Sequence, residues 1–118
     1  MSEEKIKAQQ EKIKECYKDR EIKFTDGSTY QMLEVPYRDG MKIASLQQKL
    51  LSSGEVGSDE WFTLSDMLMK YFTVIENGVQ CVLSKLPGHF DKEGNKKHYI
   101  TFVTYAAGMV THPFTPEN

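Results

Sequence analysis

The segment from residue 21 to residue 35 constrains the fold most, because polar and apolar residues alternate on both sides of an Asp-Gly pair. Asp26-Gly27 between two alternating runs is a strong signal for a tight β-hairpin. Pro36 ends the second run, since proline cannot donate to a strand ladder. An isolated hairpin is marginal in water, so it must pack on other elements. The residues expected to share its buried face are Ile22, Phe24, Tyr30 and Met32.

Two later segments have the apolar period of a helix. Residues 39–52 form the first, with Asp39 as its expected cap. Residues 58–75 form the second, with Ser58 or Asp59 as cap. Between them, residues 52–58 are rich in Ser and Gly, which predicts a flexible loop.

Two further segments fit more than one structure. Residues 79–86 continue the helical spacing, yet Asn77-Gly78 before them is a favoured hairpin turn. We expect helix there and keep strand as the alternative. Residues 98–110 fit strand propensity and a helical face equally well. The sequence therefore predicts a small single α+β domain, mainly helical, with an N-terminal β-hairpin at residues 21–35 and possible extra strands in 79–110.

The chain of 118 residues fits one domain of ordinary size. We expect a polar N-terminal helix or arm at residues 1–20, a globular domain at 21–110 and an extended tail at 111–118. The arm has few apolar positions, and the tail contains Pro113 and Pro116.

Composition excludes several classes of protein. The 15 basic and 17 acidic residues are too balanced for a general nucleic-acid binder. No apolar run reaches the roughly 20 residues of a membrane-spanning helix, and the N-terminus lacks the apolar core of a secretory signal. The two cysteines, Cys16 and Cys81, are isolated, which is typical of reduced thiols in a cytoplasmic protein. We therefore expect a cytoplasmic chain with no nucleic-acid partner and no membrane partner.

No catalytic or metal-binding pattern is recognisable. His89 and His98, with Asp91 and Glu93 nearby, make a loose cluster that lacks the tight spacing of zinc ligands. The glycines are scattered and form no phosphate-binding loop. Cys81 lies in an apolar run, which favours burial over reactivity. The sequence therefore predicts no enzyme, no cofactor and no metal site.

An apolar protein-binding surface is the most credible functional feature. Aromatic residues are enriched at interface hot spots, and methionine tolerates changeable packing. Aromatic and methionine side chains are also ordinary components of a hydrophobic core, so a core position remains the alternative for each candidate. The candidate protein-binding residues are Trp61, Phe62, Met67, Met69 and Tyr71.

The order of elements in residues 21–90 resembles the tail assembly chaperones of long-tailed bacteriophages. The likeness lies in IKFTDGSTYQMLEVPYRDGMKIASLQQKL, read as hairpin, proline turn and amphipathic helix. It continues in WFTLSDMLMKYFTVIENGVQCVLSKLPGHF, read as a helical stretch with an acidic-Asn-Gly break and an apolar continuation. The resemblance implies a protein that binds the largely helical tape measure protein and keeps it soluble until tail-tube subunits polymerise. It also implies self-association of several copies in the cytoplasm of the host.

Two other functions fit the same residues. One is a small phage protein that binds and inhibits a single host protein. The other is a minor virion component, such as a head–tail connector subunit. A chaperone should be absent from finished particles, whereas a connector should be present in a fixed ring.

Overall fold

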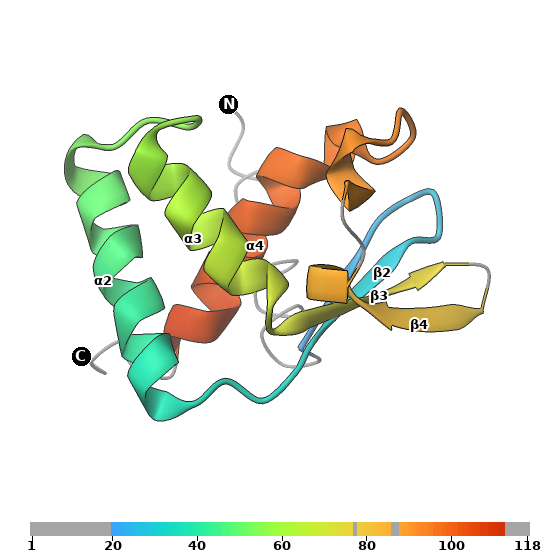
Figure 1. Cartoon of the computed structure of the whole chain (residues 1–118), viewed down its shortest axis with the longest axis horizontal. Helices are drawn as coiled ribbons and strands as arrows, with labels where there is room; N and C mark the ends of the chain where they lie inside the picture. The colour runs from blue at the N-terminus through green and yellow to red at the C-terminus, as the bar shows by residue number, and fades with distance from the viewer. Residues whose placement is uncertain (1–19, 77, 86–87, 113–118) are drawn as a thin grey trace, which may run out of the picture.

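The computed structural model describes residues 20–76, 78–85 and 88–112. Within these residues, three α-helices gather on one side of the molecule and a sheet lies on the other (Figure 1). Almost all of the predicted N-terminal arm lies outside the described residues. The elements are β1 (Glu21–Lys23), β2 (Thr29–Met32), α2 (Tyr37–Ser53), α3 (Asp59–Met69), β3 (Phe72–Glu76), β4 (Val79–Val82), the 3-10 turns η1 (Leu83–Lys85), η2 (His89–Asp91) and η3 (Lys96–His98), and α4 (Tyr99–Thr111).

The sheet has four antiparallel strands in the order β1-β2-β3-β4, so the predicted α+β class and the N-terminal hairpin are confirmed. Ile22 of β1 lies opposite Tyr30 of β2, and both side chains are buried. The turn between them has Gly27 at φ 93°, and the backbone N–H of Ser28 donates to the Asp26 carboxylate at 3.0 Å. Both features are typical of an Asp-Gly turn.

The predicted helix at residues 58–75 is too long. Ser58 caps α3 as expected, its hydroxyl accepting from the backbone N–H of Trp61 at 3.2 Å. The helix ends at Met69, however, and β3 starts at Phe72. Phe72 to Ile75 is a run of aromatic and β-branched residues that suits a buried strand. Pairing of β3 with β2 therefore overrides the helical spacing.

The helix expected at residues 79–86 is wrong, and the strand alternative is right for residues 79–82. Val79–Val82 pairs with β3 as strand β4, followed by the 3-10 turn η1. Gly78 has φ 78°, the left-handed backbone that an Asn-Gly hairpin turn requires. The local turn signal was the correct guide here, because the backbone of β3 forms hydrogen bonds with residues 79–82 across the turn.

A substitution at Gly78 tests this turn. Gly78→Ala is expected to lower the free energy of unfolding by about 1–2 kcal/mol, because an L side chain is strained at positive φ. Gly94→Ala is the matched control: a Cβ at either glycine meets no atom within 4 Å, but only Gly78 has a positive φ. Chemical denaturation of the two variants measures the difference, and equal stabilities would contradict the turn.

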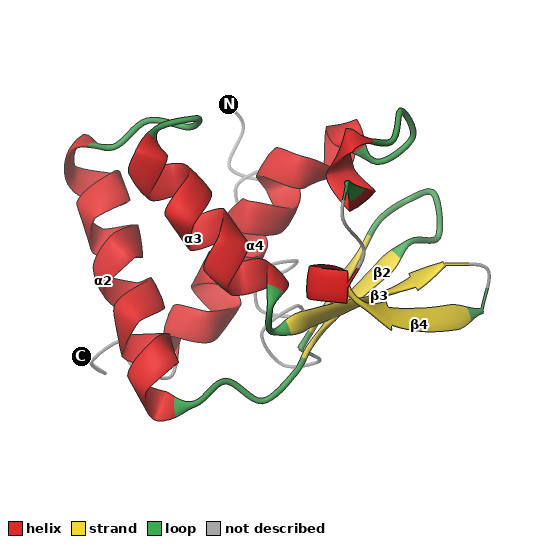
Figure 2. Ribbon diagram, viewed as in Figure 1, coloured by secondary structure: helices red, strands yellow, loops and turns green. Residues whose placement is uncertain are grey.

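The undecided segment 98–110 is a helix, α4. Eight of its thirteen residues are buried, because α4 contacts α2, α3 and β1. Figure 2 shows α4 next to α3. A helix enclosed in this way is apolar around most of its circumference. The sequence of this segment therefore fits a strand as well as a helix.

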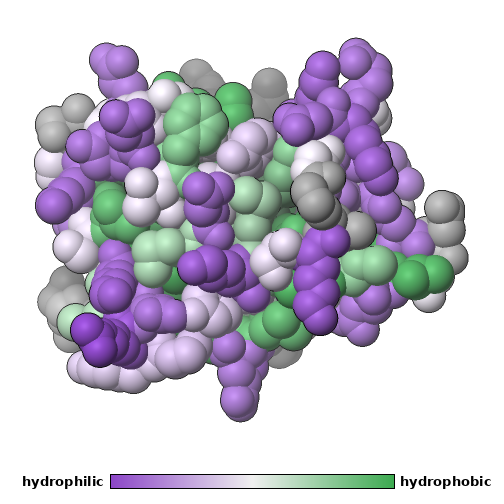
Figure 3. All heavy atoms as spheres, viewed as in Figure 1, coloured by the Kyte–Doolittle hydropathy of each residue, from purple (hydrophilic) through white to green (hydrophobic). Residues whose placement is uncertain are grey.

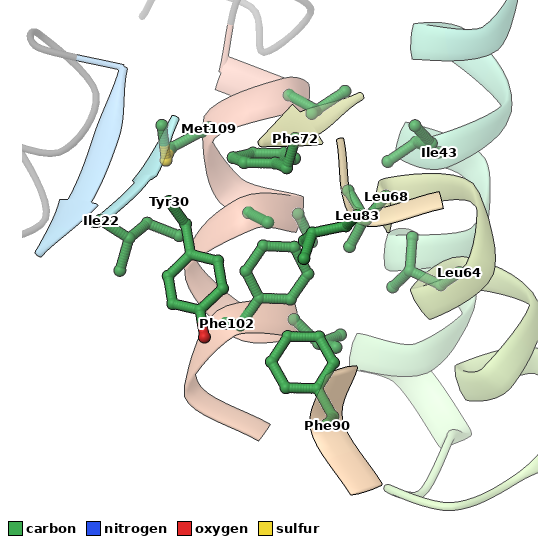
Figure 4. Packing of buried hydrophobic residues seen from close by; sticks show 14 of the residues in the cluster. Ile22, Tyr30, Ile43, Leu64, Leu68, Phe72, Leu83, Phe90, Phe102 and Met109 are labelled. Carbon is green, nitrogen blue, oxygen red and sulfur yellow. The ribbon is translucent and has the colours of Figure 1, made fainter. Parts of the chain in front are cut away.

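The core is centred on aromatic rings. Tyr30 and Phe102 are fully buried, with ring centroids 5.2 Å apart, and Phe72 meets Phe102 edge-on at 5.2 Å. Phe90 stacks on Tyr99 at 4.6 Å and lies 5.3 Å from Phe102. Figure 4 shows the rings of Tyr30, Phe72, Phe90 and Phe102 gathered beside α4. The core therefore joins the hairpin, the loop before α4 and α4 itself.

Helix α2 confirms the prediction for residues 39–52 but begins earlier, after Pro36. Asp39 is not its cap; the side chain lies in the first turn and accepts a hydrogen bond from the Tyr71 hydroxyl. This bond ties the start of α2 to the junction between α3 and β3. No helix in the described part of the chain is long and apolar enough to cross a membrane.

Candidate functional site

The five candidate protein-binding residues occupy different environments in the structure. Trp61 is only 7% exposed and belongs to the core, whereas the neighbouring Phe62 is 46% exposed. Met67, Met69 and Tyr71 are partly buried and pack against the core. Of the five, Phe62 has the largest exposed fraction, and it alone is not largely buried.

Trp61 nevertheless reaches a surface groove where three helices meet. The groove has a volume of about 210 Å³. Small-molecule pockets usually enclose about 300–1,000 Å³, so this groove suits a side chain of a protein partner better than a whole ligand. Its walls come from α2, the α2–α3 loop, α3 and α4: Gln47, Leu50, Leu51, Gly54, Glu55, Val56, Trp61, Leu64, Val103, Thr104 and Ala107.

Two large apolar side chains of the groove are mainly exposed. Leu51 at the end of α2 is 75% exposed, and Val56 in the α2–α3 loop is 59% exposed. Scattered apolar residues are normal on a protein surface, but these two adjoin a concave apolar wall. Neither residue was predicted to be functional: Leu51 lies in the helix expected at residues 39–52, and Val56 lies in the flexible loop expected at residues 52–58.

A second candidate site is a buried polar cluster beneath the hairpin. The Tyr30 hydroxyl lies 2.9 Å from His89 Nε2 and 3.2 Å from His98 Nδ1. His98 Nε2 lies 2.9 Å from Asp26 Oδ2. His89 Nδ1 lies 3.6 Å from Glu76 Oε1, too long for a hydrogen bond. The two histidines are 2% and 3% exposed.

When both histidines are neutral, their hydrogen-bond partners determine which ring nitrogen carries the proton. The Asp26 carboxylate only accepts, so His98 Nε2 carries the proton and its Nδ1 accepts from the Tyr30 hydroxyl. The Tyr30 oxygen then accepts from His89 Nε2–H. His89 Nδ1 is left as a bare acceptor facing Glu76, and it is the buried side-chain atom without a hydrogen-bond partner in the described residues.

Burial and charge shift several pKa values in this cluster. Desolvation lowers the pKa of His89, although the Glu76 charge opposes it. Desolvation also raises the pKa of Tyr30, with Glu76 and Asp26 adding to the effect. The backbone N–H of Ser28 lowers the pKa of Asp26, and the charges of His98 and Lys97 act in the same direction. The bridging hydroxyl therefore stays protonated.

The hydrogen bonds of the cluster connect segments that are distant in the sequence. They link the hairpin turn at Asp26, the strand residue Tyr30 and both ends of the loop from His89 to His98. The histidines, which form a loose group with Asp91 and Glu93 in the sequence, have Glu76 and Asp26 as the carboxylates beside their rings. In the described part of the chain, no group of three His, Cys, Asp or Glu residues is placed to hold a metal ion.

Acidification should destabilise the fold through His89. Its folded pKa lies below the unfolded value of about 6.5, so the unfolded chain binds more protons as the pH falls through this range. The free energy of unfolding is therefore expected to be lower at about pH 5.5 than at about pH 7.5. Denaturation at both pH values checks this, and His89→Gln should reduce the difference. An unchanged difference in the variant would contradict the assignment to His89.

No family model, curated protein or solved structure matches the chain.

Proposed function

We propose that the chain is a non-catalytic tail assembly chaperone of a bacteriophage, which binds apolar helical segments of the tape measure protein in the groove beside Trp61. The observation that carries the proposal is the apolar groove between α2, α3 and α4, next to the exposed side chains of Leu51 and Val56. The resemblance of residues 21–90 to such chaperones supplies the partner. Of the expected element order, the hairpin and the helix after Pro36 are present, whereas residues 72–76 and 79–82 are strands instead of a continued helical stretch.

The groove has features that suit a helical ligand. An amphipathic helix binds such a groove through apolar side chains at spacings of three and four residues. One of these side chains would enter the cavity beside Trp61, and its neighbours would cover Leu51 and Val56. Burying one large apolar side chain contributes about 1.5–3 kcal/mol. A few such contacts give moderate affinity.

Moderate affinity fits a chaperone that must be displaced. A free tape measure protein exposes apolar stripes that promote aggregation. Several copies bound along one filament would cover the stripes, and weak multivalent contacts would release as tail-tube subunits polymerise. This function requires no catalytic group, and it places the protein in the cytoplasm of the host.

Co-expression with the tape measure protein of the same phage tests the proposal. We expect the tagged chain to keep that protein soluble and to be recovered with it in several copies. Recovery in a one-to-one complex with a host protein would favour an inhibitor, and a fixed ring in finished particles would favour a connector. Either result, or failure to solubilise the partner, would contradict the chaperone function.

Two matched variants locate the binding surface. Val56→Lys places a charge at the groove and is expected to weaken binding by about tenfold or more, since burying an unpaired charge is costly. Val79→Lys changes a valine of nearly equal exposure, 60% against 59%, that lies on β4 and not in the groove. It should leave binding of the tape measure protein unchanged.

A further inference from the structure

The polar cluster is a continuous row of titratable groups. It runs from Asp26 through His98, Tyr30 and His89 to Glu76, and the facing atoms of successive groups are 2.9, 3.2, 2.9 and 3.6 Å apart. The two carboxylate side chains are 34% and 35% exposed, whereas the three rings between them are buried. Both carboxylates line one surface hollow of about 360 Å³. Protons therefore enter and leave the row at its carboxylate ends.

The row also holds the loop between η2 and η3 against the sheet. His89 and His98 lie at the two ends of this loop, and Phe24 stacks on the His98 ring with the ring centroids 4.0 Å apart. Charged residues between them, such as Lys92 and Lys96, are exposed, and the surface over the loop is hydrophilic (Figure 3). A change of protonation in the row therefore acts directly on the attachment of the loop.

In the neutral cluster, all the hydrogen bonds point toward Asp26. His98 Nε2–H donates to the Asp26 carboxylate, the Tyr30 hydroxyl donates to His98 Nδ1, and His89 Nε2–H donates to the Tyr30 oxygen. The far end of the row is incomplete, because His89 Nδ1 is a bare acceptor that faces the Glu76 carboxylate. A single proton between these two acceptors would complete the row.

We propose that the polar cluster is a one-proton switch, in which a single added proton reverses the hydrogen bonds between Tyr30 and the two histidines. The proton enters beside Glu76 and binds His89 Nδ1. His89 Nε2 then passes its own proton to the Tyr30 oxygen, and the Tyr30 hydroxyl passes its original proton to His98 Nδ1. Tyr30 gains one proton as it gives up another, so it stays protonated. The net change is one bound proton, and His89 is neutral again with its hydrogen on Nδ1.

The surrounding charges favour His98 as the place of the added charge. The Asp26 carboxylate of the β1–β2 turn lies 2.9 Å from His98 Nε2, whereas Glu76 of β3 lies 3.6 Å from His89 Nδ1. Desolvation lowers the pKa of His89, and the charge of Lys92 on the loop acts in the same direction. The reversed row therefore places an imidazolium beside the closer carboxylate and a neutral N–H donor beside Glu76.

A second proton has no stable place in the row. With both rings charged, both would donate to the Tyr30 oxygen, and the hydroxyl hydrogen would lose its acceptor. Two like charges would also adjoin in a buried space, and Lys97 adds a further positive charge near Asp26. The unfolded chain binds a proton at each histidine, so acidification still favours unfolding. The switch uses no residue of the groove and does not depend on the proposed chaperone function.

Nitrogen-15 NMR of the imidazole rings tests the inference on the unaltered chain, because bare, protonated and charged ring nitrogens differ in chemical shift. As the pH falls from about 8 to about 5.5, His89 is expected to change from the Nε2–H to the Nδ1–H tautomer and stay neutral. His98 should become charged with the same midpoint, as coupled groups do. A charge on His89 with His98 neutral, two separate midpoints, or an unchanged His89 tautomer would each overturn the inference.

Two matched variants locate the charge. Asp26→Asn removes the carboxylate beside His98, so the common midpoint is expected to fall by about one pH unit or more. Asp91→Asn makes the same chemical change at an exposed position of the loop that is not among the charges acting on His89, and it should leave the midpoint unchanged. Equal midpoints in the two variants would overturn the inference.

Tyr30→Phe tests whether the two histidines communicate through the hydroxyl. Without this oxygen, His89 should keep its tautomer when His98 becomes charged, whereas Tyr105→Phe should leave the coupled change intact. A His89 tautomer change that persists in Tyr30→Phe would overturn the relay. Asp26→Asn retains the Tyr30 hydroxyl, so it decides the question even where Tyr30→Phe does not fold.

Discussion

Replacing Phe102 with alanine is expected to lower the free energy of unfolding by about 3–5 kcal/mol, as is typical for a large aromatic residue removed from a core. Phe102 is fully buried, and its ring lies within 5.3 Å of the rings of Tyr30, Phe72 and Phe90. The cavity left by the substitution would face the sheet, η2 and α4 at once. Partial collapse of one element cannot fill it.

Chemical denaturation of Phe102→Ala measures this loss. The control is Ile100→Ala on the same helix, because Ile100 is 55% exposed and its truncation should cost less than about 0.5 kcal/mol. Similar losses at the two positions would mean that α4 does not pack between the helices and the sheet as described.

Replacing Tyr30 with phenylalanine is expected to cost about 2–4 kcal/mol although it removes a single oxygen atom. The hydroxyl is the shared partner of His89 Nε2 and His98 Nδ1 in a buried setting. Without it, two buried polar atoms lose a hydrogen bond, at about 1–3 kcal/mol each. The ring itself remains in place, so the loss comes from the polar cluster and not from packing.

The matched control is Tyr105→Phe on α4. Tyr105 also packs against the core, but no hydrogen bond joins its hydroxyl to the described residues. Thermal denaturation should show a large loss for Tyr30→Phe and almost none for Tyr105→Phe. Equal losses of stability in the two variants would contradict a stabilising role for the polar cluster.

The local turn signals in the sequence were reliable guides to the sheet. Asp26-Gly27 predicted the first hairpin correctly, and Asn77-Gly78 marked the second, although the helical spacing on both sides was given more weight. That spacing misled because a strand buried on one face and a helix both place apolar residues at several shared offsets. The pairing of β3 with β2, far earlier in the chain, decides between them.

The helix α4 was undecidable from the sequence for a related reason. It is enclosed by α2, α3 and β1, so its apolar residues do not form the single stripe of an amphipathic helix. Its neighbours are known only once the chain has folded. The sequence did contain the good helix formers Ala106 and Ala107, but their burial is a tertiary property.

Both candidate sites combine residues that are distant in the sequence. The groove joins residues from Gln47 to Ala107, and the polar cluster joins Asp26 with His98. Spacing along the chain therefore predicts neither. Trp61 was identified from composition and does line the groove, whereas Leu51 and Val56 were missed because their exposure is visible only in the fold.

The fluorescence of Trp61 tests the proposed helix binding most directly. Trp61 is the only tryptophan of the chain and lines the groove, so all tryptophan emission comes from one side chain beside that surface. A tryptophan-free apolar helical peptide from the proposed tape measure partner should shift the emission in a saturable titration. Val56→Lys should weaken this binding about tenfold or more, and Val79→Lys should leave it unchanged. Binding that leaves the Trp61 emission unaltered, or that tolerates Val56→Lys, would contradict the groove as the binding site.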